Sequence, residues 1–377
     1  MTIFQIKRTL EIMLLKSHLI IASSFVLGGG LLREIAIART FGISKELDIY
    51  VALSSIYLFL GTQIPTSIET SIISKHANMK ETEIEDVILS SISFLTWCYI
   101  FIGIIIILFG KNIFKLLFNF KEETDIAIKI LVFMIPSALF LANSVIIRSL
   151  LFIKDRQFIG IIIPGVISVS AAVSISMLGK FIGIYALPLG TLIGGIVSFF
   201  ATYRKEIRSN RIKFFNLFLS HPRGFMALAS AAVIIILGEC VFQVGYTAER
   251  SIGSRLPQGS LSTYYYSLAL LNVFLTVIIS PNNVYLFPKI AKWYNNKERL
   301  FYRIRRIIIA LFFIGCVSSV TIANFGHYIL QIFLERGKFG SEETTLTFSA
   351  LQILCYALPI MCCARTVSYT HLTLPTN

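Results

Sequence analysis

The sequence predicts an all-α, polytopic membrane protein. Of its 377 residues 55% are apolar and only 14% are charged, whereas a soluble globular protein carries about 25% charged residues. The mean hydropathy of +0.77 excludes an intrinsically disordered chain, because disorder requires low hydrophobicity. Charge-free apolar runs close to the length needed to cross a bilayer, about 20 residues, also recur along the whole chain.

Ten of these runs are expected to form membrane-spanning helices. The first is expected to extend to about residue 37, and the seventh is interrupted by Glu239 and resumes to about residue 248. The long eighth run opens with Leu-Pro-Gln-Gly-Ser, which is expected to be a loop. The first run has no A-x-A cleavage site, so no cleavable signal peptide is expected. The ten runs cover residues 17–32, 49–68, 87–110, 130–147, 157–179, 181–203, 224–238, 256–288, 307–334 and 344–364.

The positive charge of the chain follows the membrane topology. The net charge is +14, and alternate loops differ in their content of lysine and arginine by about twofold. The richer set includes residues 204–223 and 289–306, and the positive-inside rule places it, with the N-terminus, in the cytoplasm. These basic loops are expected to contact lipid headgroups, and no nucleic-acid partner is expected.

Enzyme and metal signatures are missing from the sequence. The six cysteines lie in apolar stretches without C-x-x-C spacing, so neither a disulfide framework nor a zinc site is expected. There is no H-E-x-x-H, G-x-S-x-G or Walker motif, and the loops are too short to hold a catalytic cluster. The sequence therefore predicts a protein that is not an enzyme and that has no metal or cofactor.

An internal repeat links the two halves of the chain. Phe109-Gly110-x-x-Ile recurs as Phe325-Gly326-x-x-Ile, and a Glu-Glu-Thr triplet at residues 122–124 recurs at 342–344. Because the first unit has six helices, both copies enter the membrane from the same side, which makes them parallel repeats of a kind common in transporters. The second unit has only four helices and is expected to be incomplete.

Four segments follow from this repeat. The last residues, Val-Ser-Tyr-Thr-His-Leu-Thr-Leu-Pro-Thr, match one reading frame of a common transposase-end sequencing adapter and are excluded from the fold. The expected segments are a six-helix lobe at 1–203, a basic cytoplasmic linker at 204–223, an incomplete four-helix lobe at 224–366 and an adapter translation at 367–377.

Glycines and prolines inside the spans are candidate hinges. Broken helices occur in membranes where the freed backbone groups face protein or water, and in transporters they line binding sites. Each single proline can equally be a packing kink. The glycine triplet is the more specific signal, because it is expected to interrupt the first helix just before Arg33. The expected hinge residues are Gly28, Gly29, Gly30, Pro65 and Pro281.

Ionisable residues within or beside the spans are candidate transport residues, because charges in lipid are costly and normally face a cavity or each other. Arg33 and Asp48 flank one loop, so they are expected to form either an ion pair that fixes the turn or a phosphate site at a cavity mouth. Glu239 is either a proton or cation site or a buried polar contact with Gln243 or another helix. The candidate transport residues are Arg33, Glu34, Arg39, Asp48 and Glu239.

The residues around these charges resemble the lipid II flippase (MurJ, MviN) family, within the superfamily of multidrug and oligosaccharidyl-lipid exporters. One matching stretch is Leu-Arg-Glu-Ile-Ala-Ile-Ala-Arg-Thr-Phe-Gly at residues 32–42, followed by Asp48. The other is Leu-Glu-Arg-Gly-Lys-Phe-Gly at residues 334–340, where Gly337 and Phe339 fit the family loop and Leu334 departs from it.

This resemblance implies alternating access between two lobes of six helices each, around a cationic cavity for the pyrophosphate and sugar headgroup of a polyprenyl-linked precursor. Arg33, Arg39 and Asp48 match family positions that are functional or conserved. Expected cavity cations are replaced at three places, by Leu27, by Gly61-Thr62 and by Ala269. These departures favour a divergent relative that flips another lipid-linked unit, such as an exopolysaccharide or O-antigen repeat.

The resemblance also implies about fourteen helices in a complete member, a location in the bacterial cytoplasmic (inner) membrane, and contacts with membrane lipids. Polysaccharide or cell-wall synthesis proteins are expected partners, and the protein is expected to be a monomer. Two other functions stay open: a cation-coupled multidrug exporter, which Glu239 would suit and Arg33 would not, and a non-transporting membrane partner of a polysaccharide synthase.

Overall fold

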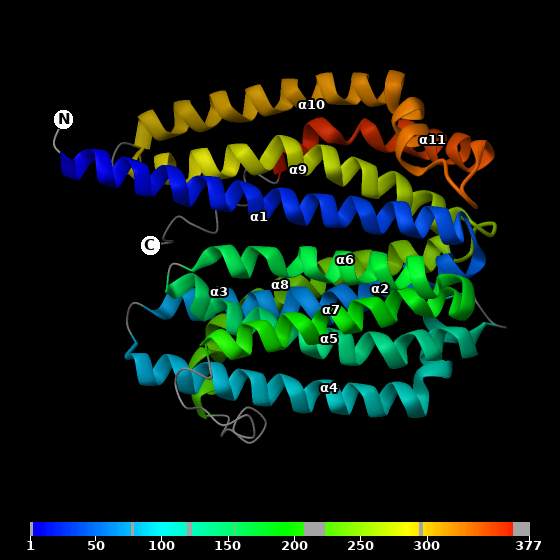
Figure 1. Ribbon diagram of the computed structural model, residues 1–377, viewed down its shortest axis with the longest axis horizontal. Helices are drawn as coiled ribbons and strands as arrows, with labels where there is room; N and C mark the ends of the chain where they lie inside the picture. The colour runs from blue at the N-terminus through cyan, green and yellow to red at the C-terminus, as the bar shows by residue number, and fades with distance from the viewer. Residues whose placement is uncertain are drawn as a thin grey trace. The chain divides into compact units, whose positions relative to one another are not determined.

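A computed structural model describes residues 3–76, 79–118, 123–154, 156–206, 223–293 and 297–364. These residues are almost entirely helical and contain no strand, which confirms the all-α prediction (Figure 1). The helices are α1 (Ile3–Phe41), α2 (Lys45–Leu58), α3 (Ile64–Lys75), α4 (Glu81–Leu117), α5 (Thr124–Ile153), α6 (Gln157–Ile182), α7 (Ala186–Glu206), α8 (Arg223–Gly253), α9 (Ser260–Trp293), α10 (Lys297–Leu334) and α11 (Ser341–Cys355).

The predicted spans all fall on these helices. Within the described residues, eight stretches are long and apolar enough to cross a membrane, or nine if the bent pair Ser341–Cys355 and Leu358–Ala364 is one span. The stretch Gln157–Arg204 contains both α6 and α7, which are 26 and 21 residues long. Counting these two separately, and the bent pair as one further span, gives the ten spans that the sequence predicts. The expected Leu-Pro-Gln-Gly-Ser loop is confirmed, since α9 begins at Ser260.

The chain divides into two compact units, residues 1–261 and 262–377. The first unit contains α1 to α8, and α8 packs on α2, α3 and α4. The compact units therefore divide at a different place from the repeat boundary expected at 204–223, most of which (207–222) lies outside the described residues. The adapter segment 367–377 also lies outside them, and both the repeat and the adapter stay predictions.

Glycines let the helices of the first unit pack closely. A Cβ on Gly190 of α7 would lie 2.6 Å from the Cα of Ala171 in α6, and one on Gly194 would lie 2.7 Å from the Cα of Ile167. Small residues four apart are the usual way for membrane helices to approach backbone to backbone. The turn between α6 and α7 needs Gly183, whose φ of +61° and ψ of −141° suit only glycine.

The glycine triplet of α1 behaves differently from the expected helix break. α1 is one continuous helix from Ile3 to Phe41 in this conformation. A Cβ on Gly29 would lie 3.1 Å from the carbonyl oxygen of Gly165 in α6, whereas Gly28 and Gly30 have nothing within 4 Å of that position. Gly29 therefore serves close packing of α1 on α6 here, and bending at the triplet stays a prediction about another conformation.

The second predicted span is interrupted at its middle. The segment Phe59–Gln63 is a π-helical turn, in which the amide of Ile64 bonds to the carbonyl of Phe59, five residues back. Pro65 follows at once and has no amide hydrogen to continue an α-helical ladder. The buried Tyr99 of α4 donates a hydrogen bond to the carbonyl oxygen of Leu60. Irregular backbone in this span is therefore satisfied by a neighbouring helix, as the bilayer interior requires.

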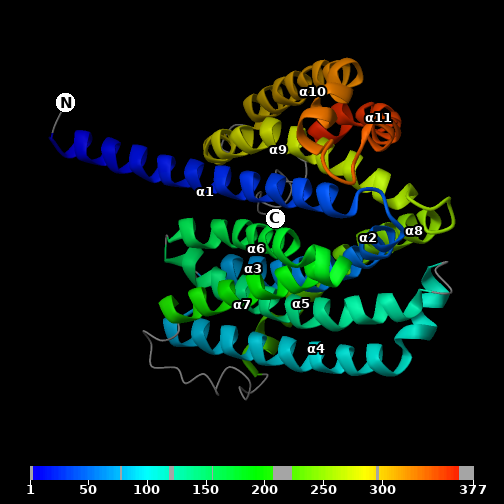
Figure 2. The same cartoon turned by 45° about the vertical axis from the view of Figure 1, so that its right-hand side comes forward.

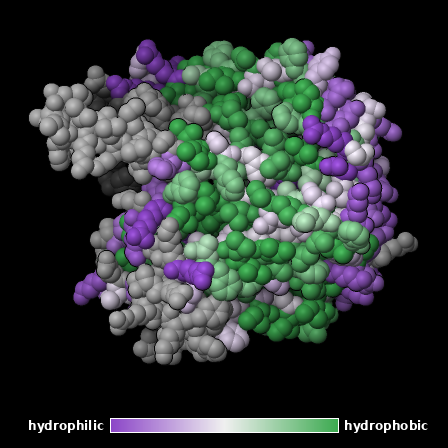
Figure 3. Space-filling model, viewed as in Figure 1, coloured by the Kyte–Doolittle hydropathy of each residue, from purple (hydrophilic) through white to green (hydrophobic). Residues whose placement is uncertain are grey.

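The helices present apolar side chains along their middle and polar ones near their ends (Figure 3). In the α4 span only 28% of the most apolar window is buried within the protein, against 72% in the α5 span. α5 therefore forms the centre of the first unit, between α2, α3, α4 and α7. The exposed apolar side chains of α4 are those that a bilayer would solvate.

The second unit contains α9, α10 and α11, and its contacts favour the predicted repeat. Gly326 of α10 faces Phe348 of α11, 3.1 Å from a Cβ position, and Gly110 of α4 faces Ile128 of α5 at 2.7 Å. The glycine of each repeated Phe-Gly pair thus lies at a close approach to the next helix in sequence. α11 lies on α10, and the buried Ser267 of α9 donates to the carbonyl of Thr347 at 2.9 Å.

Candidate functional site

An ion pair in α1 lies at the centre of the candidate site. The Nε and Nη2 atoms of Arg33 are 3.1 Å and 2.6 Å from Oε1 of the neighbouring Glu34. The Arg33 side chain is 34% exposed and that of Glu34 is 11% exposed. Glu34 is thus buried and Arg33 only partly covered by protein, within a candidate membrane span that runs from Ile20 to Phe41.

The depth of this pair demands polar surroundings. Arg33 lies eight residues before the end of α1, which corresponds to about 12 Å at 1.5 Å per residue. Charged side chains at such a depth pair with one another or face a water-filled cavity. Pairing Arg33 with Glu34 lowers the cost of the charge, and the exposed part of the guanidinium can still bind an anion.

Arg39 is exposed and does not share the surface of Arg33. Residues on one face of a helix are three or four positions apart, so a separation of six places Arg39 on a different side of α1. The two arginines, which the sequence grouped together, therefore face different surroundings.

Asp48 bonds to the turn between α8 and α9, which is distant from it in the sequence. Its N-terminal position in α2 follows from Ser44, whose hydroxyl caps the helix by accepting from the Leu47 amide at 3.4 Å. The Oδ2 atom of Asp48 accepts a hydrogen bond from the amide of Gly259, 2.6 Å away and 211 positions later in the chain. Gly259 has a φ of +90°, and a Cβ there would lie 2.4 Å from Ile43.

Arg33 and Asp48 each have a partner that the sequence did not predict, and the expected Arg33–Asp48 pair stays a prediction. Arg33 bonds to Glu34, and the buried carboxylate of Asp48 bonds to the turn between α8 and α9. A neighbouring ion pair joins Lys45 at the start of α2 to Glu123 before α5. Three connections of the first unit, those before α2, α5 and α9, thus meet beside Asp48.

Glu239 is half-buried in α8, inside the candidate span Ala232–Gly253, of which only 6% is buried. Gln243, the residue expected to contact Glu239, bonds to another residue through its amide group. The Nε2 atom of Gln243 donates to the hydroxyl of Thr247 at 3.1 Å. Whether Glu239 binds a proton or a cation stays a prediction.

Two charged residues that the sequence did not single out form a buried ion pair. Nε and Nη2 of Arg148 in α5 lie 2.8 Å and 2.5 Å from the two carboxylate oxygens of Glu69 in α3. Their side chains are only 16% and 4% exposed. The sequence counted Arg148 among the loop cations that set topology. Glu69 and Arg148 each directly follow a charge-free run and lie inside a candidate span, which was a signal for pairing.

Among the described residues, no group of three or more histidine, cysteine, aspartate or glutamate side chains could hold a metal ion. The site therefore consists of charged side chains and backbone turns.

Apolar helices of membrane-spanning length, a span broken at a π-helical turn, and charges held inside the spans define a multi-pass membrane transporter (Figures 1 and 2). The model of the lipid II flippase MurJ family matches residues 37–370, and the chain belongs to this family. Its members are multi-pass proteins of the inner membrane and are flippase transporters, which gives no support to an enzyme.

Individual relatives agree with this assignment. The lipid II flippase MurJ of Thermosipho africanus (strain TCF52B) is 27% identical over 188 residues, which is 48% of this chain and 38% of the relative. The chain thus spans well under half of that protein.

Two solved structures have a similar fold. A lipid II flippase MurJ in an inward-closed conformation matches with a TM-score of 0.80 and 22% identity, over 92% of this chain and 74% of the other. An inward-facing multidrug resistance transporter of the MATE family, in the MOP superfamily, matches with a TM-score of 0.67 and 13% identity, over 89% and 78% of the two chains. Both likenesses concern the fold alone.

Proposed function

We propose that this protein moves a polyprenyl-pyrophosphate-linked oligosaccharide, either lipid II or a related exopolysaccharide or O-antigen repeat unit, across the bacterial inner membrane by alternating access. The observation that carries the proposal is the Arg33–Glu34 pair, a partly exposed guanidinium about 12 Å inside a membrane span. Family membership and the likeness to the lipid II flippase MurJ of Thermosipho africanus support the same substrate class.

The chemistry of Arg33 suits a pyrophosphate. A guanidinium presents planar, parallel N–H donors that bind phosphate oxygens in pairs, and such charge-assisted bonds are about twice as strong as neutral ones. In the present conformation the donors Nε and Nη2 converge on one carboxylate oxygen of Glu34. A phosphate would compete with Glu34 for these donors, so Glu34 takes the role of counter-ion that the sequence gave to Asp48.

Asp48 and the glycine triplet would then act on conformation. Asp48 is a positioning residue in this proposal, because its carboxylate holds the turn at Gly259 beside the end of α1. Gly28 and Gly30 have free space around them and would let α1 bend, and the π-helical turn before Pro65 would let the next span bend. These joints would turn Arg33 between the two access states.

The test uses cells whose export of a lipid-linked sugar depends on this protein. Arg33→Ala should abolish export while the protein still inserts at wild-type levels, and Arg33→Lys should restore only part of it, because an ammonium cannot make the planar two-point contact. Lys180→Ala, which removes an exposed cation elsewhere in the first unit, is the matched control and should leave export unchanged. Wild-type export by Arg33→Ala would refute the proposal.

A second function is favoured by one specific observation. The fold is also similar to that of a MATE-family transporter, and Glu239 is a half-buried carboxylate inside a span. A cation-coupled drug exporter would need this carboxylate to bind its coupling cation. Glu239→Gln should then abolish drug resistance. Under the flippase proposal, Arg33→Ala should reduce export of the lipid-linked sugar more than Glu239→Gln does.

The orientation and assembly of the protein belong to the same proposal. The distribution of lysine and arginine supports a cytoplasmic N-terminus. We expect the protein to work as a monomer, with enzymes of cell-wall or polysaccharide synthesis as its partners. Labelling of single cysteines from either side of the membrane tests the orientation.

A further inference from the structure

An apolar groove runs along the outer surface of α4 and α5. It has a volume of about 350 Å³, and its lining includes Gly103, Ile104 and Ile107 of α4 with Val132 and Pro136 of α5. The absence of a side chain at Gly103 keeps the groove open, since a Cβ there would meet only Ile135, at 3.8 Å.

The groove lies at membrane depth and faces outward. Its residues belong to the candidate spans Thr82–Leu117 and Thr124–Ile153. Ile107 is 68% exposed and Val132 is 49% exposed. Side chains exposed at this depth meet hydrocarbon, so the occupant must be a hydrocarbon chain.

Three lysines lie at one end of the groove. Lys111 and Lys115 follow Ile107 at intervals of four residues, which places all three on one face of α4. Lys129 precedes Val132 by three residues on α5. Nζ of Lys111 lies 2.7 Å from Asp125, whose carboxylate also feels the charges of Lys129 and Lys115. Three positive charges thus surround one negative charge.

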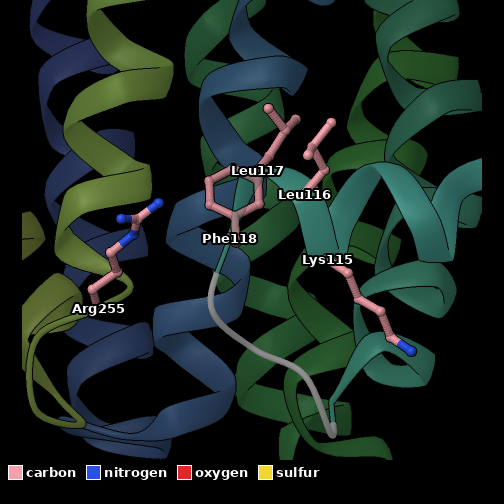
Figure 4. Close-up of a pocket in the computed structure, with 5 residues that line it drawn as sticks. All are labelled: Lys115, Leu116, Leu117, Phe118 and Arg255. Carbon is pink, nitrogen blue, oxygen red and sulfur yellow. The ribbon is translucent and has the colours of Figure 1, made fainter.

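Lys115 also lines a neighbouring pocket, together with Leu116, Leu117, Phe118 and Arg255 (Figure 4). The ammonium of Lys115 points away from Arg255, so the two cations do not converge on one ligand there. The positive charge of Lys115 is therefore available at the surface of α4.

The dimensions of the groove and the lysines match one leaflet. Ile100, at the inner end of the groove, lies eleven residues from Lys111, or about 16 Å along the helix. Half of the hydrocarbon core is about 15 Å thick. A lipid with its headgroup at the lysines would therefore place its chain along the whole groove.

We propose that this surface is a binding site for an anionic phospholipid, with a hydrocarbon chain in the α4–α5 groove and the phosphate held by Lys111, Lys115 and Lys129. The complementarity of charge selects a phosphate-bearing headgroup with net negative charge, and the apolar lining selects its tail. This site is separate from Arg33 and does not depend on the transport activity.

The test measures lipid binding to the purified protein in detergent by native mass spectrometry. Phosphatidylglycerol should bind well and phosphatidylcholine weakly. Lys115→Gln/Lys129→Gln should weaken phosphatidylglycerol binding roughly fivefold per lysine, or about 25-fold in all. Lys180→Gln should leave it unchanged. Gly103→Leu, whose Cβ fits but whose side chain fills the groove, should weaken it as well.

Three outcomes would overturn the proposal. Equal binding of both lipids would show that the lysines do not select the headgroup. Unchanged binding by Gly103→Leu would show that the groove does not hold the hydrocarbon chain. Stronger binding of a polyprenyl phosphate than of phosphatidylglycerol would assign the groove to the tail of a transported lipid instead. Circular dichroism of each variant confirms that a loss of binding is not a loss of fold.

Discussion

The buried pair of Arg148 and Glu69 gives the sharpest prediction about stability. Glu69→Gln keeps the shape of the side chain but removes the charge that neutralises Arg148. Glu69 is 4% exposed and receives two hydrogen bonds of 2.8 Å and 2.5 Å. Removing one partner of such a pair leaves an uncompensated buried charge and costs about 3–5 kcal/mol.

The surroundings of Arg148 support the upper part of this range. Its guanidinium lies 5.4 Å from the ring centre of Phe152, so the aromatic face covers it. A Cβ on Gly160 would lie 2.7 Å from Cγ of Arg148, which shows that α6 closes over the side chain. The arginine therefore has little room to turn toward water when Glu69 is neutralised.

The assay is unfolding in mixed detergent and SDS micelles, with the free energy of unfolding compared between variants. The matched control is Asp125→Asn, which breaks the pair with Lys111, whose side chains are 62% and 70% exposed. An exposed pair contributes about 0–1 kcal/mol, so the control should change stability little. Equal losses for Glu69→Gln and Asp125→Asn would refute the reasoning.

A double variant separates charge from packing. Glu69→Leu/Arg148→Met replaces both charges by apolar groups of similar size, and such replacements of a buried pair are often neutral or stabilising. The double variant should therefore be more stable than Glu69→Gln alone. If it is less stable, packing of the two side chains matters more than their charges.

Three further predictions concern single positions. Gly190→Val should destabilise the protein by about 1–3 kcal/mol, because its Cβ would overlap the backbone of α6. Gly30→Ala lies in open space and should raise stability by up to about 1 kcal/mol. Unfolding in SDS measures both changes. Tyr99→Phe should cost about 1–3 kcal/mol by leaving the carbonyl of Leu60 without its donor, and faster amide exchange in the π-helical turn should accompany this loss. Asp48→Asn keeps an oxygen that can accept from the α8–α9 turn, so stability should be retained; a loss of transport without a loss of stability would then assign the charge itself to function.

The secondary structure and the number of spans followed from the sequence because they depend on local properties. A run of about 20 apolar residues must satisfy its backbone hydrogen bonds internally in a bilayer, and a helix is the way to do so within one segment. The Leu-Pro-Gln-Gly-Ser loop before α9 followed for the same reason, from turn residues at consecutive positions. The family resemblance rested on another local pattern, the charges of residues 32–42 followed by Asp48.

The partners of the charged groups were decided only by the tertiary structure. Asp48 bonds to an amide 211 positions away, and Glu69 pairs with an arginine 79 positions away. Arg33, for which the sequence suggested Asp48 as a partner across a short loop, bonds to its neighbour Glu34. Helical periodicity fixes which side of a helix a residue occupies, but the neighbouring helix on that side depends on how distant segments pack. The sequence therefore determined which residues are costly to bury in a membrane, and packing determined what neutralises each of them.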